Sequence, residues 1–485
     1  MRNFQVAIVG GGVIGSAIAW ELSKYNINVV VFEKGSDVAS GTSKANSGVI
    51  HSGINSAPDS LKAFYCVKGN QMLHSISKKI GLEVKWIGKY VIAKDERELN
   101  ELKRLKKVGI KNNVPDLKIV NSDKVNEKNV NCKSALWVPT AGIVSPYEFT
   151  IALAENAAEN NVKFLLETQV KNIKKTSNNF IISTNKGEYK SDILVNAAGL
   201  NCKDIVSMVE EPDFNVYPCR GEYLVLDKNY SSLVNSMIYP VPVKELGVLG
   251  VHITPTIEGN IILGPSAEFI EDPDDKKTTK NMMKSLLEEA KEIIPKIPDK
   301  AVINAYSGVR CKLASEKEGG WADFRIQESK KNPNMINLLG IESPGLTAAP
   351  AIAEDIKKMI SKKIKIKPKQ KFKTAEPKMK RFQDMTKKQQ TELIKKDQRW
   401  GRIVCRCEHI TEAEVIKALK NPIGAKTLSA VKYRCRAGMG RCQGGFCTQH
   451  IVRIMEEQFK INFKNITLKS PESNIFYRRN REEKQ

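Results

Sequence analysis

Residues 5–33 read QVAIVGGGVIGSAIAWELSKYNINVVVFE, and this stretch decides the fold of the 485-residue chain. The apolar residues 5–9 predict a short buried strand, residues 16–24 an apolar helix, and residues 29–32 a second strand. A strand that runs through a tight glycine turn into a helix, and then into a second strand, is the opening unit of a doubly wound fold. The fold class is therefore expected to be α/β.

Three glycines in this turn form the pattern G-x-G-x-x-G at Gly10, Gly12 and Gly15, and Glu33 follows 18 residues after the last of them. Gly10 permits the turn, Gly12 lets the backbone approach a diphosphate, and Gly15 allows close packing of the helix on the strand. The helix start offers unpaired N–H groups to the diphosphate, and Glu33 can accept hydrogen bonds from a ribose. These residues predict a dinucleotide site but do not choose between NAD and FAD.

Three later stretches of sequence favour FAD over NAD, because they resemble motifs of a known family. Residues 43–53 (SKANSGVIHSG), 192–200 (DILVNAAGL) and 340–347 (GIESPGLT) resemble, in order, three flavin-contacting motifs of the D-amino-acid-oxidase-like superfamily. Within it, glycerol-3-phosphate and L-2-hydroxyglutarate dehydrogenases are the most similar groups. The resemblance covers residues 5–360 and implies FAD, which we expect to be bound non-covalently. The residues implied to contact FAD are Gly10, Gly12, Gly15, Glu33, Ser43, Asn46, Ser47, Ala198, Gly199, Gly340, Gly345, Leu346 and Thr347.

The chain between these motifs predicts a second, mixed β-sheet. Residues 217–226, 239–243, 250–254 and 260–263 have strand-like patterns bounded by Gly and Pro. We expect a Rossmann-like FAD-binding domain with an inserted β-sheet substrate domain, followed by a small helical iron–sulfur domain. The expected bounds are 1–75, 142–205 and 330–362 for FAD binding, 76–141 and 206–329 for substrate, 363–400 for a basic linker, 401–465 for the iron–sulfur domain and 466–485 for a polar tail.

The inserted sheet contains the candidate substrate residues. The resemblance implies that Arg310 binds the anionic end of a substrate, because a guanidinium pairs two oxygens of a phosphate or carboxylate. Arg220 and Tyr223 are further candidate substrate contacts. Oxidation of an alcohol also requires a group that removes the hydroxyl proton, and a histidine suits this task. His51 and His252 both lie in family-like motifs and are the candidate catalytic bases.

The chain carries a formal net charge of +24, with 78 Lys and Arg against 54 Asp and Glu. This excess favours anionic substrates or acidic partners. Residues 361–399 hold 15 basic and 4 acidic residues, which is typical of a solvated linker. Neither aromatic interleaving nor a binding motif accompanies these charges, so nucleic-acid binding is not expected. The basic residues Arg478, Arg479 and Arg481 permit peripheral contact with a membrane, but no apolar run reaches the roughly 18 residues that would span one.

Five of the ten cysteines fall within residues 405–447. We expect a reducing, cytoplasmic compartment, in which such a cluster binds metal rather than forming disulfides. Four zinc-binding thiolates are an alternative, although C-x-C is unusual for structural zinc. The segment resembles the bacterioferritin-associated-ferredoxin-like domain, which implies a 2Fe–2S cluster. The implied ligands are Cys405, Cys407, Cys442 and Cys447, with Cys435 left as a free thiol.

Together these observations predict a dehydrogenase in which a hydride passes from substrate to flavin N5. Electrons then pass singly through the 2Fe–2S centre to a partner subunit or protein. The first expectation for the substrate is sn-glycerol 3-phosphate, which would become dihydroxyacetone phosphate. L-2-hydroxyglutarate or another 2-hydroxy acid is the second candidate substrate. The sequence is also compatible with an amine or opine dehydrogenase subunit, and with an electron-transfer subunit that lacks a working substrate site.

Overall fold

The glycine turn joins strand β1 (Arg2–Val9) to helix α1 (Val13–Leu22) in the computed structural model, which describes residues 2–177, 179–242, 250–374 and 380–477. Strand β2 (Val29–Phe32) then runs parallel to β1, with Val29 opposite Val6. The predicted order of strand, turn, helix and strand is thus confirmed. The helix begins three residues earlier than expected because Gly12, in extended conformation, is its N-cap.

A first sheet of eight strands is built around β1. The strand order is β10-β11-β12-β1-β2-β9, with β20 on β12 and β19 on β20. Strands β12 and β20 run parallel to their neighbours β1 and β12, as in a doubly wound fold. The remaining strands are β9 (Lys163–Leu165), β10 (Val170–Lys175), β11 (Phe180–Thr184), β12 (Gly187–Asn196), β19 (Arg325–Glu328) and β20 (Met335–Leu339).

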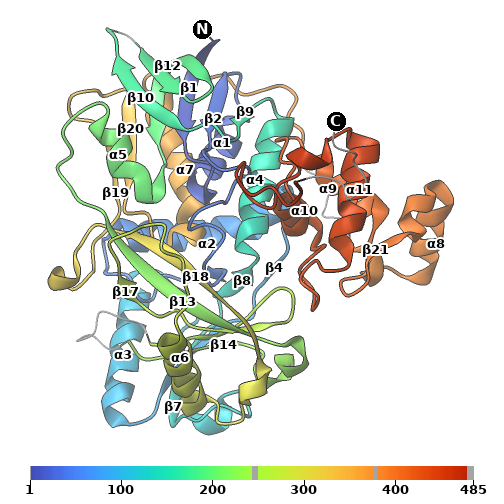
Figure 1. Cartoon of the computed structure of the whole chain (residues 1–485). Helices are drawn as coiled ribbons and strands as arrows, with labels where there is room; N and C mark the ends of the chain where they lie inside the picture. Colours follow the sequence, from blue (N-terminus) through green and yellow to red (C-terminus); the bar gives the residue numbers. More distant parts are fainter. Residues whose placement is uncertain (1, 178, 243–249, 375–379, 478–485) are drawn as a thin grey trace.

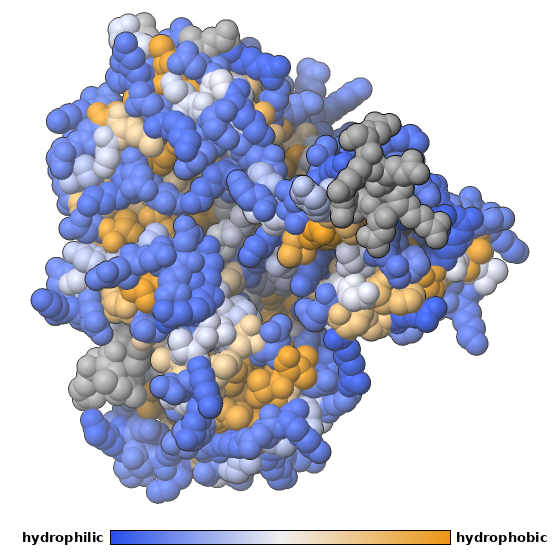
Figure 2. Space-filling model, viewed as in Figure 1, coloured by the Kyte–Doolittle hydropathy of each residue, from blue (hydrophilic) through white to orange (hydrophobic). Residues whose placement is uncertain are grey.

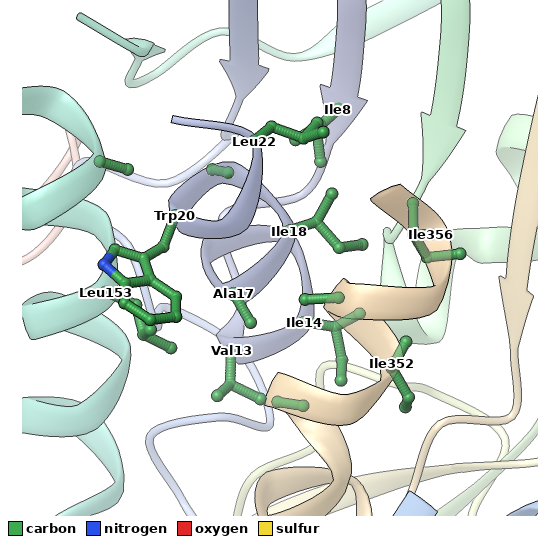
Figure 3. Close-up of a cluster of buried hydrophobic side chains, with 14 of the residues drawn as sticks. Ile8, Val13, Ile14, Ala17, Ile18, Trp20, Leu22, Leu153, Ile352 and Ile356 are labelled. Atoms are coloured by element: carbon green, nitrogen blue, oxygen red, sulfur yellow. The ribbon is translucent and has the colours of Figure 1, made fainter. Parts of the chain in front are cut away.

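Helix α1 forms the centre of the largest core. It packs between helices α4 (Pro146–Glu159) and α7 (Gly345–Ser361), and all ten of its residues are buried. Figure 3 shows Ile352 and Ile356 of α7 on one side of α1 and Leu153 of α4 beside Trp20 on the other. The two remaining helices of this region are α2 (Leu61–Lys79) and α5 (Cys202–Ser207).

A second sheet of nine strands forms the lower half of the molecule in Figure 1. Its order is β17-β13-β16-β15-β14-β5-β7-β6, with β18 paired to β13. The strands are β5 (Lys89–Ala93), β6 (Lys118–Asn121), β7 (Ser134–Val138), β13 (Tyr217–Leu226), β14 (Met237–Pro240), β15 (Ile253–Pro255), β16 (Ile261–Leu263), β17 (Glu268–Phe269) and β18 (Val302–Lys312). Its two helices are α3 (Glu96–Lys111) and α6 (Lys280–Ile293). This confirms the inserted mixed sheet.

Three predicted strands of this sheet have different bounds. Strand β16 differs by one residue, since it begins at Ile261 instead of residue 260. Strand β14 ends at Pro240, and the expected end at Val243 lies outside the described residues. Strand β15 begins at Ile253 instead of Gly250, because Gly250 has a φ of +69° and so leaves the extended conformation. A small third sheet contains β3 (Val49–Ile50), β4 (Val84–Lys85) and β8 (Gly142–Val144). In the sequence, these strands occur where the chain passes from one large sheet to the other.

The segment expected as a solvated linker contacts the folded domain. Its described residues form backbone hydrogen bonds with the loop between α1 and β2. The backbone N–H of Asn26 donates to the Lys367 carbonyl at 2.8 Å, and that of Lys369 donates to the Lys24 carbonyl at 2.8 Å. Helix α8 (Lys387–Lys396) follows, capped by a reciprocal hydrogen-bond pair between Thr386 and Gln389. Composition alone misses these features because backbone hydrogen bonds do not depend on the lysine side chains.

The C-terminal unit, residues 403–466, has its own core. It contains β21 (Ile403–Cys405), β22 (Ile410–Thr411), α9 (Glu412–Leu419), α10 (Leu428–Cys435) and α11 (Cys447–Phe459). Thr411 and Glu414 form a capping box at the start of α9. Arg478, Arg479 and Arg481 of the predicted tail lie outside the described residues.

Hydrophilic residues dominate the face of the molecule drawn in Figure 2, in keeping with the high content of charged residues. Among the residues that the structure describes, no helix combines the length and the apolar composition required to cross a membrane.

Replacing Ile18 by Ala tests the central position of α1. Ile18 is 0% exposed, so we expect the free energy of unfolding to fall by about 2–5 kcal/mol, the range for such truncations in a packed core. Chemical denaturation followed by circular dichroism measures this loss. Ile303→Ala removes the same atoms from a residue that is 55% exposed, and it should leave the unfolding curve almost unchanged. Equal losses for both variants would contradict the assigned core.

Candidate active site

The glycine turn has space for a ligand because its glycines lack side chains. Gly10 has a φ of +109°, and a Cβ there would lie 2.5 Å from the Ala197 carbonyl oxygen. A Cβ on Gly15 would lie 1.9 Å from the carbonyl oxygen of Gly10. A Cβ on Gly12 would lie 3.1 Å from Ser43 Oγ. The positive φ of Gly10 matches the predicted turn, and the close approach of Gly15 to Gly10 matches the predicted packing, whereas the approach of a diphosphate to Gly12 stays a prediction.

Glu33 lies at the end of β2, directly opposite the glycine turn. Its Oε2 accepts a hydrogen bond from the Gly11 N–H at 2.7 Å, and its Oε1 accepts one from the Gly35 N–H at 2.7 Å. Burial raises the pKa of this carboxyl, and the two hydrogen bonds act in the opposite direction. Each carboxylate oxygen keeps a second acceptor site, so the group can still bind a ribose hydroxyl.

The second flavin-like motif is fixed to the start of α1. Ser43 Oγ accepts a hydrogen bond from the Val13 N–H at 2.9 Å. The Asn46 side chain closes its own loop, because its amide nitrogen donates to the Ser43 carbonyl at 3.0 Å and its oxygen accepts from the Gly48 N–H at 2.9 Å. Asn46 therefore shapes the loop through its side chain.

The last flavin-like motif meets the second one at the start of α7. Thr347 Oγ1 accepts a hydrogen bond from the His51 N–H at 2.9 Å. Gly345 and Leu346 are the first two residues of α7. The Gly345 N–H donates to the Glu342 carbonyl at 2.5 Å, and the Leu346 N–H has no acceptor within the helix. Gly340 has a φ of +65°, and a Cβ there would lie 2.5 Å from Leu313 Cγ. The arrangement directs a helix N-terminus, which favours negative charge, toward the same region as His51.

Ala198 and Gly199 follow the end of β12, beside the glycine turn. The Ala197 N–H donates to the Val9 carbonyl at 3.0 Å, and this bond holds the Ala-Ala-Gly stretch next to β1. Gly199 has a φ of +59° and begins a short turn. The four motifs are thus adjacent although they are spread over more than 300 residues of sequence.

Arg310 and Tyr223 are brought together by the pairing of β13 with β18. Arg310 lies opposite Cys219 in this pair, and its guanidinium donates to the Ser266 carbonyl at 3.0 Å. Burial raises the pKa of Tyr223, and the charge of Arg310 together with hydrogen bonds from Ser47 and Arg310 opposes this rise. Burial lowers the pKa of Arg310, but Tyr223, Cys219 and other neighbours more than offset this effect and raise it. The guanidinium therefore remains charged beside the second flavin-like motif.

Two further contacts hold β18 against that motif. A Cβ on Gly308 would lie 1.9 Å from the Ala45 carbonyl oxygen, so only glycine allows this approach. Tyr306 stacks on Tyr223 with ring centroids 4.7 Å apart, and its hydroxyl donates to the Asn46 carbonyl at 3.1 Å.

Arg220 does not lie beside Arg310 and Tyr223. Side chains alternate across a strand, so Arg220 lies on the opposite face of β13 from Cys219 and Tyr223. It is 1% exposed, and its guanidinium donates to Asp275 at 2.7 Å and Glu268 at 2.5 Å. These carboxylates occupy the donors that a substrate would require, and they explain why a buried arginine is tolerated here.

The two candidate histidines have different surroundings. His51 Nε2 lies 3.3 Å from Ser343 Oγ, and burial together with the charge of Lys89 lowers its pKa to about 3. His252 stacks on Tyr239, with ring centroids 3.5 Å apart. The Lys89 Nζ lies 4.5 Å from the Tyr239 ring centroid, so the lysine connects the surroundings of the two histidines.

Lys89 is a candidate functional residue that sequence reasoning missed. It is 1% exposed, and burial lowers its pKa to about 8. The only signal was its position at the start of the apolar run Lys89–Ala93, because a buried strand rarely contains an unpaired lysine. In a chain with 78 basic residues, that signal does not stand out.

The four predicted cysteine ligands line one pocket of the C-terminal unit, together with Arg406 and Phe446. Cys407 Sγ lies 3.8 Å from Cys405 Sγ and 3.9 Å from Cys442 Sγ. A hydrogen bond from Cys447 lowers the pKa of Cys405 to about 5, and the backbone N–H groups of Phe446 and Gly444 lower that of Cys442. Thiolates that accept backbone N–H donors match the chemistry of an iron–sulfur site.

Cys435 lies outside this pocket lining. Its thiol donates to the Val431 carbonyl at 3.3 Å, within its own helix, and burial raises its pKa to about 12. Cys435 therefore lies apart from the four thiols that line the pocket.

Known proteins resemble the chain in both parts. The family described as FAD dependent oxidoreductase matches residues 5–359, and the BFD-like 2Fe–2S binding domain matches residues 403–457. A glycerol 3-phosphate dehydrogenase from Caloramator mitchellensis is 41% identical over 470 residues, which cover 96% of each chain. An L-2-hydroxyglutarate dehydrogenase from Arabidopsis thaliana is 30% identical, covering 73% of this chain and 83% of the relative.

A solved structure agrees with these matches. The dithionite-reduced L-α-glycerophosphate oxidase of Mycoplasma pneumoniae, which has FAD bound, superposes with a TM-score of 0.72 at 30% identity. The superposition covers 77% of this chain and 98% of the oxidase. The glycine turn, the flavin-like motifs and the cysteine pocket fit the cofactors that these families bind. The chain therefore belongs to the FAD-dependent oxidoreductase family, carries a BFD-like 2Fe–2S binding domain, and has FAD and a 2Fe–2S cluster as its cofactors.

Proposed function

We propose that this protein is a dehydrogenase that oxidises sn-glycerol 3-phosphate to dihydroxyacetone phosphate and passes the electrons through its 2Fe–2S cluster to a partner protein. The observation that carries the proposal is the partly buried guanidinium of Arg310 beside Tyr223, whose hydroxyl also contacts Ser47 of the second flavin motif. A relative named glycerol 3-phosphate dehydrogenase, similar over almost the whole chain, supports the choice of substrate.

Arg310 is the proposed anchor for the phosphate. Its guanidinium donates to the Ser266 carbonyl and, at 3.6 Å, to the Cys219 thiol, neither of which neutralises its charge. Arg220, by contrast, is already paired with two carboxylates. A planar guanidinium can bind two phosphate oxygens at once, and the adjacent Tyr223 hydroxyl can donate to a third. Anchoring one end of the substrate in this way orients its hydroxyl for reaction.

His51 is the proposed base. Its depressed pKa leaves the imidazole neutral at ordinary pH, so one ring nitrogen can accept the hydroxyl proton. FAD, when bound, supplies the hydride acceptor, and the 2Fe–2S cluster supplies a one-electron acceptor. The ammonium of Lys89 adds positive charge to the same region, which favours both an anionic substrate and the neutral state of His51. His252, stacked on Tyr239, is the second candidate base.

L-2-hydroxyglutarate is the second candidate substrate, because the same guanidinium can bind a carboxylate and a relative from Arabidopsis thaliana has that name. An amine substrate, or a role confined to electron transfer, would follow if neither hydroxy compound reacted. We also propose that the basic surface contacts a membrane peripherally. The electron acceptor is proposed to be a partner subunit or protein.

Anaerobic titration of the purified holoprotein tests the substrate. We expect sn-glycerol 3-phosphate to bleach the flavin absorbance band, whereas an equal concentration of L-2-hydroxyglutarate should leave it unchanged. Bleaching by the hydroxy acid alone would replace the proposed substrate. If neither compound bleached the flavin, the proposed reaction would be wrong, and amines would be titrated next.

Replacing Arg310 by Ala tests the anchor. Loss of a desolvated charge pair should weaken transition-state binding by about 2–5 kcal/mol, measured as kcat/KM, because the phosphate would remain without its partner. Bound FAD, measured from its absorbance, should stay stoichiometric. Arg325→Ala removes a partly exposed ion pair to Asp213 on the first sheet and serves as the control. An unchanged kcat/KM in the Arg310 variant would exclude this anchor.

The pH profile tests His51. Its pKa in the folded protein lies below the ordinary value of 6.5, so the neutral form persists until the pH falls toward about 3. We therefore expect kcat/KM to show no acidic limb near pH 6.5 that arises from His51. His51→Gln should lower the rate of flavin reduction by about 10²–10⁴-fold, the usual contribution of a general base. The exposed His74→Gln is the control. A limb near pH 6.5 that vanishes in His51→Gln would contradict the assigned state.

A further inference from the structure

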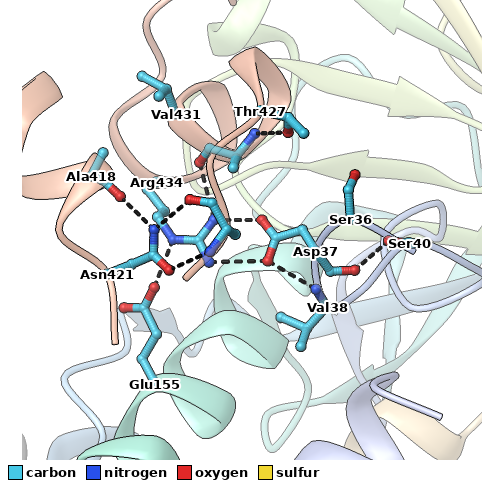
Figure 4. Close-up of polar contacts among 12 residues, drawn as sticks. Ser36, Asp37, Val38, Ser40, Glu155, Ala418, Asn421, Thr427, Val431 and Arg434 are labelled. Carbon is cyan, nitrogen blue, oxygen red and sulfur yellow. Dashed lines mark hydrogen bonds and ion pairs between the residues drawn. The ribbon is translucent and has the colours of Figure 1, made fainter. Parts of the chain in front are cut away.

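Arg434 joins the C-terminal unit to the surroundings of the flavin site. It lies on α10, and its guanidinium donates to both oxygens of Asp37 at 2.5 and 3.1 Å and to Glu155 at 2.6 Å. Figure 4 shows the guanidinium between these two carboxylates, one on the loop after β2 and one on α4. Its side chain is only 6% exposed. Asp37 is four residues from Glu33, the residue assigned to the ribose.

A second arginine, Arg436, joins the same unit to the second sheet. Its Nε donates to Glu408 at 2.9 Å, and a terminal nitrogen lies 3.3 Å from Glu258, which follows β15. Glu258 also accepts a hydrogen bond from the Tyr147 hydroxyl at 3.2 Å. Arg434 and Arg436 therefore hold the C-terminal unit to two different parts of the flavoprotein.

Apolar side chains fill the junction between these ion pairs. One hydrophobic cluster contains residues from both sides, and its buried members are Val38, Ile151, Ala154, Ile423, Ala425 and Ala430. Tyr433 packs against this cluster and lies 5.0 Å from Tyr147, measured between ring centroids. The Lys44 Nζ, within the second flavin motif, lies 5.2 Å from the Tyr433 ring centroid. The junction thus reaches the flavin motif itself.

The cysteine pocket is connected directly to this junction. Met439, three residues before Cys442, has its sulfur 3.8 Å from the Tyr147 hydroxyl. Buried ion pairs contribute little net stability, but each imposes strict geometry, because any other orientation would leave a charge buried and unpaired. Hydrophobic contacts hold two surfaces together without direction, whereas these arginines select one orientation.

We propose that Arg434 and Arg436 are positioning residues that lock the C-terminal unit in one orientation on the flavoprotein and thereby fix the cysteine pocket relative to the flavin site. This inference rests on the proposed passage of electrons from flavin to cluster. The two electrons that leave the substrate must cross the junction one at a time, each continuing to the external acceptor. Because electron tunnelling slows exponentially with distance, a unit free to reorient would transfer them more slowly.

The double variant Arg434→Ala/Arg436→Ala in the holoprotein tests this inference with two measurements. Hydrogen–deuterium exchange reports the protection of residues 36–40 and 423–434 at the junction. Stopped-flow absorbance reports the rate at which the cluster is reduced after the flavin. We expect exchange at the junction to increase and cluster reduction to slow roughly tenfold or more, since the variant removes the ion pairs of two buried arginines with four carboxylates, three of which lie on the flavoprotein. Flavin bleaching by sn-glycerol 3-phosphate should keep its rate.

Two matched variants separate orientation from general damage. Arg434→Lys/Arg436→Lys keeps both charges but loses both planar forks, so it should recover part of the rate that the double alanine variant loses. Arg453→Ala removes an exposed pair with Glu457 on α11 of the same unit and should match the parent protein in both measurements. Cluster reduction at the parent rate in the double variant, or unchanged junction protection, would overturn the inference.

The inference can fail independently of the proposed substrate. A light-driven deazaflavin reductant reduces the flavin without any substrate, so the transfer to the cluster can be timed even if sn-glycerol 3-phosphate proves inactive. Loss of bleaching by this substrate in the parent protein would contradict the proposed function alone. A parent-like transfer rate in the double variant after photoreduction would contradict the positioning role alone.

Discussion

The contact between Gly15 and the carbonyl oxygen of Gly10 is the constraint on which the architecture depends. Any side chain at position 15 would collide with that oxygen, since a Cβ would lie only 1.9 Å away. Without the contact, α1 could not start directly after β1, where the Val13 N–H donates to Ser43 Oγ. Helices α4 and α7 pack on α1, and α7 starts at the last flavin motif. One glycine contact therefore positions both ends of the cofactor site.

Two arginines of the second sheet lie on opposite faces of it, because side chains alternate along a strand. Arg310 and Tyr223 share the face directed at the flavin motifs, whereas Arg220 lies on the other face of β13 with its own carboxylates. The first guanidinium donates to a carbonyl and a thiol, which leave its charge in place. The second holds β13 to β17 and the following loop. The first arginine is therefore the proposed substrate anchor, whereas the second is structural.

The C-terminal unit is attached by the same combination of forces that stabilises a domain interior. Apolar residues from both sides fill the junction, and the buried Arg434 and Arg436 form ion pairs across it. The preceding basic segment adds backbone hydrogen bonds to the loop between α1 and β2. The high lysine content of that segment is typical of a solvated linker, but backbone groups pair regardless of the side chains they bear.

The sequence alone determined the features whose chemistry lies in neighbouring residues. The glycine turn with Glu33, the flavin motifs and the four clustered cysteines each carry their spacing within a short stretch, so the α/β fold and both cofactors could be predicted from them. Only the tertiary structure decided which distant residues meet. The face of β13 that carries Arg220, the burial of Lys89 near His51 and the pairing of Arg434 with Asp37 depend on strand register and domain packing. Those contacts join residues far apart in the chain, and no local pattern records them.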